Sequence, residues 1–149
     1  MTGVYNTSFE VSLRILIILN TVSDKLTIDR IAALDFITTY GKDFGVSEYN
    51  LHGDNNFKFS EFASKRKIVS QAIKEIVLKG YVESYCNKSG FYYGISKSGV
   101  SFCKSLSDDY ADNLTNIAKT ANNLFSNYSD KKLINFINEH AIARFGGKG

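Results

Sequence analysis

The chain has 149 residues, of which 44% are hydrophobic, and a formal net charge of +3 at pH 7. This length allows one domain with a buried core, and the hydrophobic share is ordinary for a globular protein. So small a positive charge permits contact with nucleic acid but does not argue for it. Two cysteines are too few for a disulfide framework, and we expect both to be reduced. The N-terminus lacks the architecture of a signal peptide, which predicts a cytoplasmic protein with no membrane contact.

The first predicted helix covers residues 9–22, with Thr7 or Ser8 as its N-cap. Glu10 precedes Arg14 by four residues, which is the order that favours a helical ion pair. Residues 15–19 are apolar without interruption, so this helix should be covered on more than one side. The run could also be a buried strand, but the cap and the length favour a helix.

The second predicted helix begins after Thr27 and ends near residues 40–41. Its periodicity places Asp35 on the same face as Ile28 and Ile31, at the edge of the core. Asp35 could be a buried pairing site or a partly solvated acid beside a basic neighbour. We favour the partly solvated acid, because carboxylates are seldom fully buried.

Residues 41–59 form an unusually long connection that mixes turn residues with apolar ones such as Phe44, Val46 and Leu51. Loops of this length are uncommon in compact domains and are usually functional when ordered. In a helix-turn-helix that reads DNA, the corresponding turn has only a few residues. The sequence therefore predicts an ordered loop that serves a partner.

Residues 60–95 predict a long helix, a glycine stop and a β-hairpin. Ser60 is the expected N-cap, and Gly80 is the expected residue of positive φ after the last turn. Strands rich in aromatic and β-branched residues flank the turn chemistry of residues 87–90. Another helix is expected over residues 99–106. This order of elements is typical of a winged helix-turn-helix.

Residues 110–128 repeat apolar side chains at alternating steps of four and three, which predicts a helix with a coiled-coil-like seam. Ser129 should cap a last helix, followed by a loose tail at residues 146–149. The expected fold class is mostly α with a small β-hairpin wing, in a single domain. A winged helix-turn-helix-like core would cover residues 8–106, including the 41–59 insertion, and a C-terminal helical hairpin would cover residues 107–145.

The sequence offers little for catalysis, and we expect no catalytic residue, metal site or cofactor. His52 and His140 are the only histidines, and neither has a partner at metal-ligand or triad spacing. Candidates for contact with DNA phosphates lie on the central helix and at the wing tip: Lys65, Arg66, Lys67, Lys74 and Lys88. Any exposed helix face carries lysine, however, and Ile68 and Leu78 on the exposed side are more typical of contacts to protein.

An ordered series of short motifs runs from residue 6 to residue 99. The motifs are Asn6-Thr7-Ser8-Phe9-Glu10, Leu13-Arg14-Ile15-Leu16, Arg30-Ile31, Leu34-Asp35-Phe36-Ile37, Tyr40, Asp43-Phe44-Gly45, Leu51-His52-Gly53-Asp54-Asn55, Glu61, Lys65-Arg66, Gly80-Tyr81-Val82, Ile95-Ser96 and Gly99. This series resembles the middle component of ABC-three-component systems, and in particular the small accessory subunit of Lamassu-type antiphage defence.

The resemblance implies a subunit without a catalytic centre of its own. It would bridge an SMC-like ATPase that senses abnormal DNA to an effector nuclease, with contact to the DNA backbone inside the complex. The candidates for partner contact come from the motifs, the insertion and the start of the seam: Phe9, Glu10, Arg14, Asp43, Phe44, Leu51, His52, Tyr110 and Leu114. The alternative is a stand-alone winged-helix transcriptional regulator that dimerises through its C-terminal helices.

Overall fold

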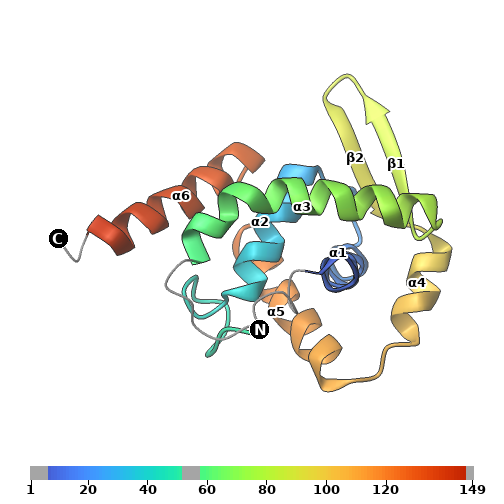
Figure 1. Ribbon diagram of the computed structural model, residues 1–149, viewed down its shortest axis with the longest axis horizontal. Helices are drawn as coiled ribbons and strands as arrows, with labels where there is room; N and C mark the ends of the chain where they lie inside the picture. The colour runs from blue at the N-terminus through green and yellow to red at the C-terminus, as the bar shows by residue number, and fades with distance from the viewer. Residues whose placement is uncertain (1–6, 52–57, 147–149) are drawn as a thin grey trace.

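The computed structural model describes residues 7–51 and 58–146 of the chain. In chain order these form α1 (Ser8–Val22), α2 (Ile28–Thr39), α3 (Lys58–Leu78), β1 (Val82–Asn87), β2 (Gly90–Ile95), α4 (Lys97–Lys104), α5 (Asp109–Leu124) and α6 (Asp130–Gly146). Figure 1 shows α3 lying across the molecule, with the hairpin projecting near its C-terminal end and α6 at the opposite end. The prediction of a mostly helical fold with one antiparallel hairpin is confirmed.

Helix α1 occupies the centre of the core. Thr7 caps it by accepting a hydrogen bond from the Glu10 amide (3.2 Å), and Ser23 ends it in the left-handed region at φ 59°. Every residue from position 14 to position 19 is buried, because α1 packs against α2, α3, α4 and α5. The prediction of a helix covered on more than one side is confirmed.

Helix α2 is also surrounded, and its N-terminus is bonded to the turn between α5 and α6. Arg30 donates hydrogen bonds to the carbonyls of Phe125 (2.7 Å) and Tyr128 (2.5 Å). The Thr27 hydroxyl donates to Asp130 at 2.5 Å. These bonds join segments about a hundred positions apart in the sequence, so α5 and α6 are packed on α2 as part of one continuous core.

Helix α3 begins at Lys58, two residues before the predicted cap at Ser60, so that cap prediction is wrong. The prediction for Gly80 is confirmed. It has φ 83°, and the next amide, that of Tyr81, donates to the carbonyl of Ile76 at 2.9 Å. This pattern ends a helix where a side chain would resist positive φ, and it turns the chain directly into β1.

The hairpin is a regular antiparallel pair in which Val82 lies opposite Ile95 and Asn87 lies opposite Gly90. The Asn87 side chain accepts from the Ser89 amide at 2.7 Å, which closes the turn. At the base, Leu26 and Tyr93 exchange backbone hydrogen bonds of 2.9 and 2.8 Å. The base of the hairpin is therefore fixed to the helical core while its tip extends outward (Figure 1).

Two details of the last three helices differ from the prediction. Helix α4 begins at Lys97, with Ser96 as its cap, rather than at residue 99. Ser129 caps α6 as predicted, accepting from the Lys132 amide at 3.1 Å. The seam of α5 is buried against α1 and α2, but its member Leu124 is 54% exposed, so the seam ends before that residue.

Candidate functional site

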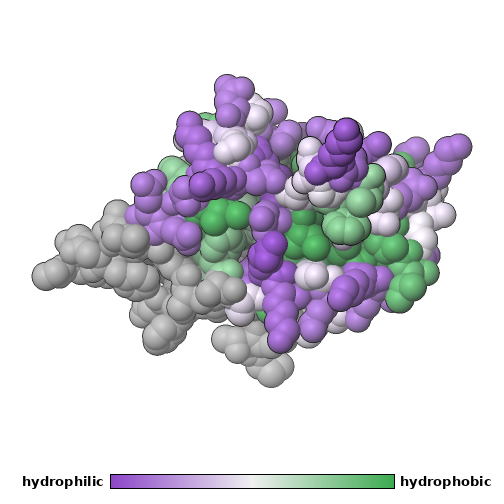
Figure 2. Space-filling view, turned by 90° about the horizontal axis from the view of Figure 1, so that it is seen from above, coloured by the Kyte–Doolittle hydropathy of each residue, from purple (hydrophilic) through white to green (hydrophobic). Residues whose placement is uncertain are grey.

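A groove of about 380 Å³ lies between the C-terminal half of α3 and the hairpin. It is lined by Ile73, Lys74, Val77, Leu78, Ser84, Phe91 and Tyr93. Figure 2 looks down onto this side of the molecule and shows a band of hydrophobic surface with hydrophilic surface on both sides. Lining of this kind is suited to contact with another apolar surface.

The alternation of side chains along the hairpin produces one wall of the groove. The cross-strand pairs Ser84–Tyr93 and Cys86–Phe91 lie on the same face as the buried Val82 at the base. This face leaves the core as the hairpin projects, so Phe91 is 63% exposed. The sequence analysis did not single out Phe91. The signal that could have identified it is its pairing with Cys86, which lies four positions after the core residue Val82 and therefore on the same face of β1.

The other wall is the end of α3. Leu78, the last residue of this helix, is 87% exposed. Leu78 comes two positions after the buried Ile76, so the helical repeat turns it away from the core face and places it at the rim of the groove. The prediction that Leu78 lies on the exposed side is confirmed.

The five candidates for phosphate contact do not share one environment. Lys67, Lys74 and Lys88 are exposed, and Lys67 and Lys74 lie on one face of α3. Arg66 is also exposed, but it forms an ion pair with Asp29 of α2. Lys65 is buried and its ammonium lies 3.3 Å from the carboxylate of Asp35, so its position does not suit contact with DNA.

A buried ionic cluster joins three helices through Arg14 of α1, Asp35 of α2 and Lys65 of α3. The Arg14 guanidinium donates to the two oxygens of Asp35 at 2.7 and 3.3 Å, and Lys65 reaches one of them. Burial alone would raise the pKa of Asp35, but the two cations and their hydrogen bonds hold it far below its ordinary value. The preferred interpretation of Asp35 as partly solvated is therefore wrong.

The same cluster changes the interpretation of two partner candidates. Burial alone would lower the pKa of Arg14, but the Asp35 carboxylate raises it above its ordinary value, so the guanidinium stays charged inside the core. Tyr110 of α5 is half-buried and interacts with Arg14, and burial raises the pKa of its hydroxyl. Arg14 thus holds α1 and α2 together and is not available at the surface. Its expected helical pairing partner, Glu10, is only partly exposed.

The insertion after α2 contributes to the core where the structure describes it. Phe44 and Val46 are buried, and the Phe44 ring lies 4.9 Å from the His140 ring and 6.0 Å from the Phe136 ring of α6. The Val46 amide donates to the carbonyl of Gly41 at 2.9 Å. Phe44, predicted as a candidate for partner contact, is therefore a packing residue in this structure and is only 6% exposed.

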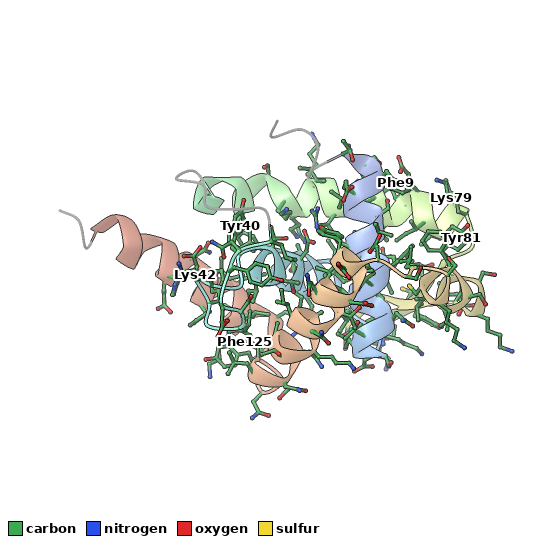
Figure 3. All side chains as sticks on the ribbon, turned by 90° about the horizontal axis from the view of Figure 1, so that it is seen from below. Phe9, Tyr40, Lys42, Lys79, Tyr81 and Phe125 are labelled. Atoms are coloured by element: carbon green, nitrogen blue, oxygen red, sulfur yellow. The ribbon has the colours of Figure 1, made fainter. Side chains whose placement is uncertain are left out.

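The remaining partner candidates are dispersed. Phe9 is 68% exposed at the start of α1, where Figure 3 shows it at one edge of the molecule. Asp43 and Leu51 are half-buried in the insertion, and His52 lies outside the described residues. Leu114, also predicted as a candidate for partner contact, is completely buried in the seam of α5. The structure does not bring these residues together on one surface.

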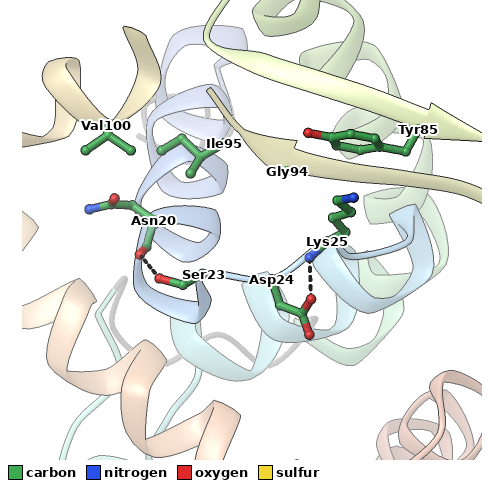
Figure 4. A pocket seen from close by; sticks show the side chains of 8 residues that line it. All are labelled: Asn20, Ser23, Asp24, Lys25, Tyr85, Gly94, Ile95 and Val100. Carbon is green, nitrogen blue, oxygen red and sulfur yellow. Dashed lines mark hydrogen bonds between the residues drawn. The ribbon is translucent and has the colours of Figure 1, made fainter. Parts of the chain in front are cut away.

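A second hollow, of about 310 Å³, lies on the opposite side of the hairpin (Figure 4). The Lys25 ammonium lies 3.8 Å from the centre of the Tyr85 ring, and the Tyr85 hydroxyl donates to Glu83 at 3.1 Å, which raises the pKa of Tyr85. Asn20 and Asp24 also line it. These contacts join the hairpin to the loop after α1.

Residues 7–51 and 58–146 contain no group of three or more His, Cys, Asp or Glu side chains that could hold a metal ion. None of the helices described there combines the length and the apolar character needed to cross a membrane.

Comparison with protein families gives one match. The family model described as ABC-three-component (ABC-3C) system middle component 2 matches residues 4–146, which is almost the whole chain. Comparison with curated proteins finds no match, and comparison with solved structures finds none either.

Proposed function

Because the chain belongs to the middle component 2 family of ABC-three-component systems, and is thus an accessory subunit of a multi-component defence system, we propose that it is a non-catalytic scaffold. It bridges an SMC-like ATPase to an effector nuclease and couples the sensing of DNA by the ATPase to release of the effector. The Lamassu-type accessory subunit, which the motifs resemble, is the pattern for these roles. The family match over residues 4–146 is the observation that carries the proposal.

The surface of the chain supports a scaffold role. Leu78 and Phe91 expose large apolar side chains on neighbouring elements, which is the kind of surface that protein contacts cover. Phe9 offers a separate exposed aromatic side chain at the start of α1. A bridging subunit needs two separate contact areas, and these two areas lie on different elements.

Purification of the tagged chain from cells that express its complete system tests the proposal. We expect the chain to be recovered in a stable complex with an ATPase subunit and a nuclease subunit, and the isolated chain to have no nuclease or ATPase activity. A stable monomer with no affinity for either component would contradict the scaffold role. Enzymatic activity of the isolated chain would contradict the non-catalytic role.

The exposed lysines favour a second candidate, a stand-alone winged-helix regulator. Lys67 and Lys74 lie on one face of α3 and Lys88 lies in the turn of the hairpin, where a winged domain contacts phosphates. A regulator would bind a particular duplex tightly, with affinity that falls steeply as salt rises. A mobility-shift series with specific and scrambled duplexes distinguishes the regulator from the scaffold. A scaffold would give only a weak shift that does not depend on the DNA sequence.

A further inference from the structure

We propose that the groove between α3 and the hairpin binds an amphipathic helix of a partner subunit, and that this helix carries acidic side chains beside its apolar stripe. The inference rests on the proposed function, since it assigns a surface and a chemistry to one of the contacts that a scaffold makes.

The shape of the groove suits a helix. Its walls are an α-helix on one side and a two-stranded ribbon on the other. Both are fixed to the core, α3 through the buried side chains of Ile73 and Ile76 and the hairpin through the Leu26–Tyr93 bridge. Grooves between rigid elements bind amphipathic helices through side chains at positions i, i+3, i+4 and i+7. A groove that is already formed requires little reorganisation on binding.

The apolar lining is more exposed than the fold requires. Ile73 and Val77 lie at the floor, where Ile73 is buried and Val77 packs on the core, whereas Leu78 and Phe91 at the rims are largely exposed. The rim side chains contribute little to the core of the isolated chain. Their burial against a partner would remove apolar surface from water at both edges of the groove.

The charge of the groove selects an acidic partner. Lys74 forms part of the lining, and Lys67 lies on the same face of α3, two turns earlier. The described lining includes no carboxylate. The nearest acids along the chain are engaged elsewhere: Glu75 accepts a hydrogen bond from Ser8 at 2.7 Å, and Glu83 lies on the other face of the hairpin, where it accepts from Tyr85.

A protein helix fits this lining better than a DNA duplex does. Five of the seven lining residues are aliphatic or aromatic, with Lys74 and Ser84 as the exceptions. Interfaces with DNA are more polar and far more positively charged than this. Phosphates placed in the groove would lie against Leu78 and Phe91, which can offer them no hydrogen bond.

The experiment uses the complete system, co-expressed and purified through the tagged chain. Two variants change the groove, Leu78→Asp at its rim and Lys74→Glu on its wall. Two matched controls make the same changes at exposed positions of α5, Leu124→Asp and Lys119→Glu. A photo-crosslinking residue at position 78, Leu78→p-benzoylphenylalanine, reports what occupies the groove. Thermal melting of each isolated variant verifies that the fold is retained.

We expect both groove variants to weaken association with one partner subunit roughly tenfold or more, as for a central interface residue, while both controls stay within about twofold of the wild type. The crosslink should map to a partner segment with apolar residues at helical spacing and acidic neighbours.

If the wild-type complex forms and the groove variants bind as the controls do, the proposal is overturned while the scaffold function stands. A crosslink to DNA, to a second copy of the chain or to a non-helical segment also overturns it. A wild-type chain that joins no complex would overturn the proposed function itself.

Discussion

Replacement of Asp35 by asparagine should destabilise the protein severely. The substitution keeps the shape of the side chain but removes the charge, so the buried cations Arg14 and Lys65 lose the carboxylate that both contact. Breaking a buried ion pair in this way costs about 3–5 kcal/mol. For a chain of this length, each kcal/mol lowers the melting temperature by about 2–4 °C, so we expect a decrease of roughly 6–20 °C.

Two further variants test the reasoning in the same melting assay. Asp29→Asn makes the identical change in an ion pair whose partner, Arg66, is largely exposed, and it should cost about 1 kcal/mol or less. The triple variant Arg14→Met, Asp35→Leu, Lys65→Met removes all three charges and should recover much of the stability that Asp35→Asn loses. If Asp35→Asn melts no lower than Asp29→Asn, the buried cluster does not have the energetic role assigned to it.

Three further outcomes can be measured on the isolated chain. The pKa of Asp35 is lower in the folded state than in the unfolded state, so its contribution to stability is present above pH about 4 and should be lost as the pH falls further. In urea titrations, the decrease in the free energy of unfolding at acid pH should therefore be smaller for Asp35→Asn than for the wild type. Gly99→Ala should destabilise the protein by about 1–3 kcal/mol although alanine favours helices, because the new Cβ would collide with the Tyr81 carbonyl oxygen. Ser98→Ala, at the neighbouring exposed position, should be near neutral in the same denaturation assay. Leu78→Asp should leave the melting temperature within about 2 °C of the wild type, since Leu78 makes little contact with the core, and a larger decrease would mean that it packs in solution.

Local signals in the sequence predicted the elements well, because their causes lie within a few residues. The Thr7 and Ser129 caps, the positive φ of Gly80 and the turn that Asn87 closes all depend on short-range hydrogen bonds or backbone sterics. The uniformly apolar run at residues 15–19 correctly indicated a helix surrounded by others.

Apart from the starts of α3 and α4, which were misplaced by two residues, the errors concern contacts between residues far apart in the chain. The cations that bind Asp35 come from α1 and α3, and nothing within α2 shows that both will converge on one carboxylate. Phe44 looked like a docking residue because its insertion is long, but α6, ninety positions later, supplies the rings that cover it. The groove was missed for the same reason, since its walls are separate elements and only the tertiary fold places Leu78 beside Phe91.

The bonds from Arg30 to the α5–α6 turn have a practical consequence for dissecting the protein. A fragment that stops after α4 would leave the Arg30 guanidinium without the carbonyls of Phe125 and Tyr128, and would uncover the faces of α1 and α2 on which α5 packs. The segment from α1 to α4 and the last two helices thus depend on each other's contacts, and their roles are better assigned by point substitution than by truncation.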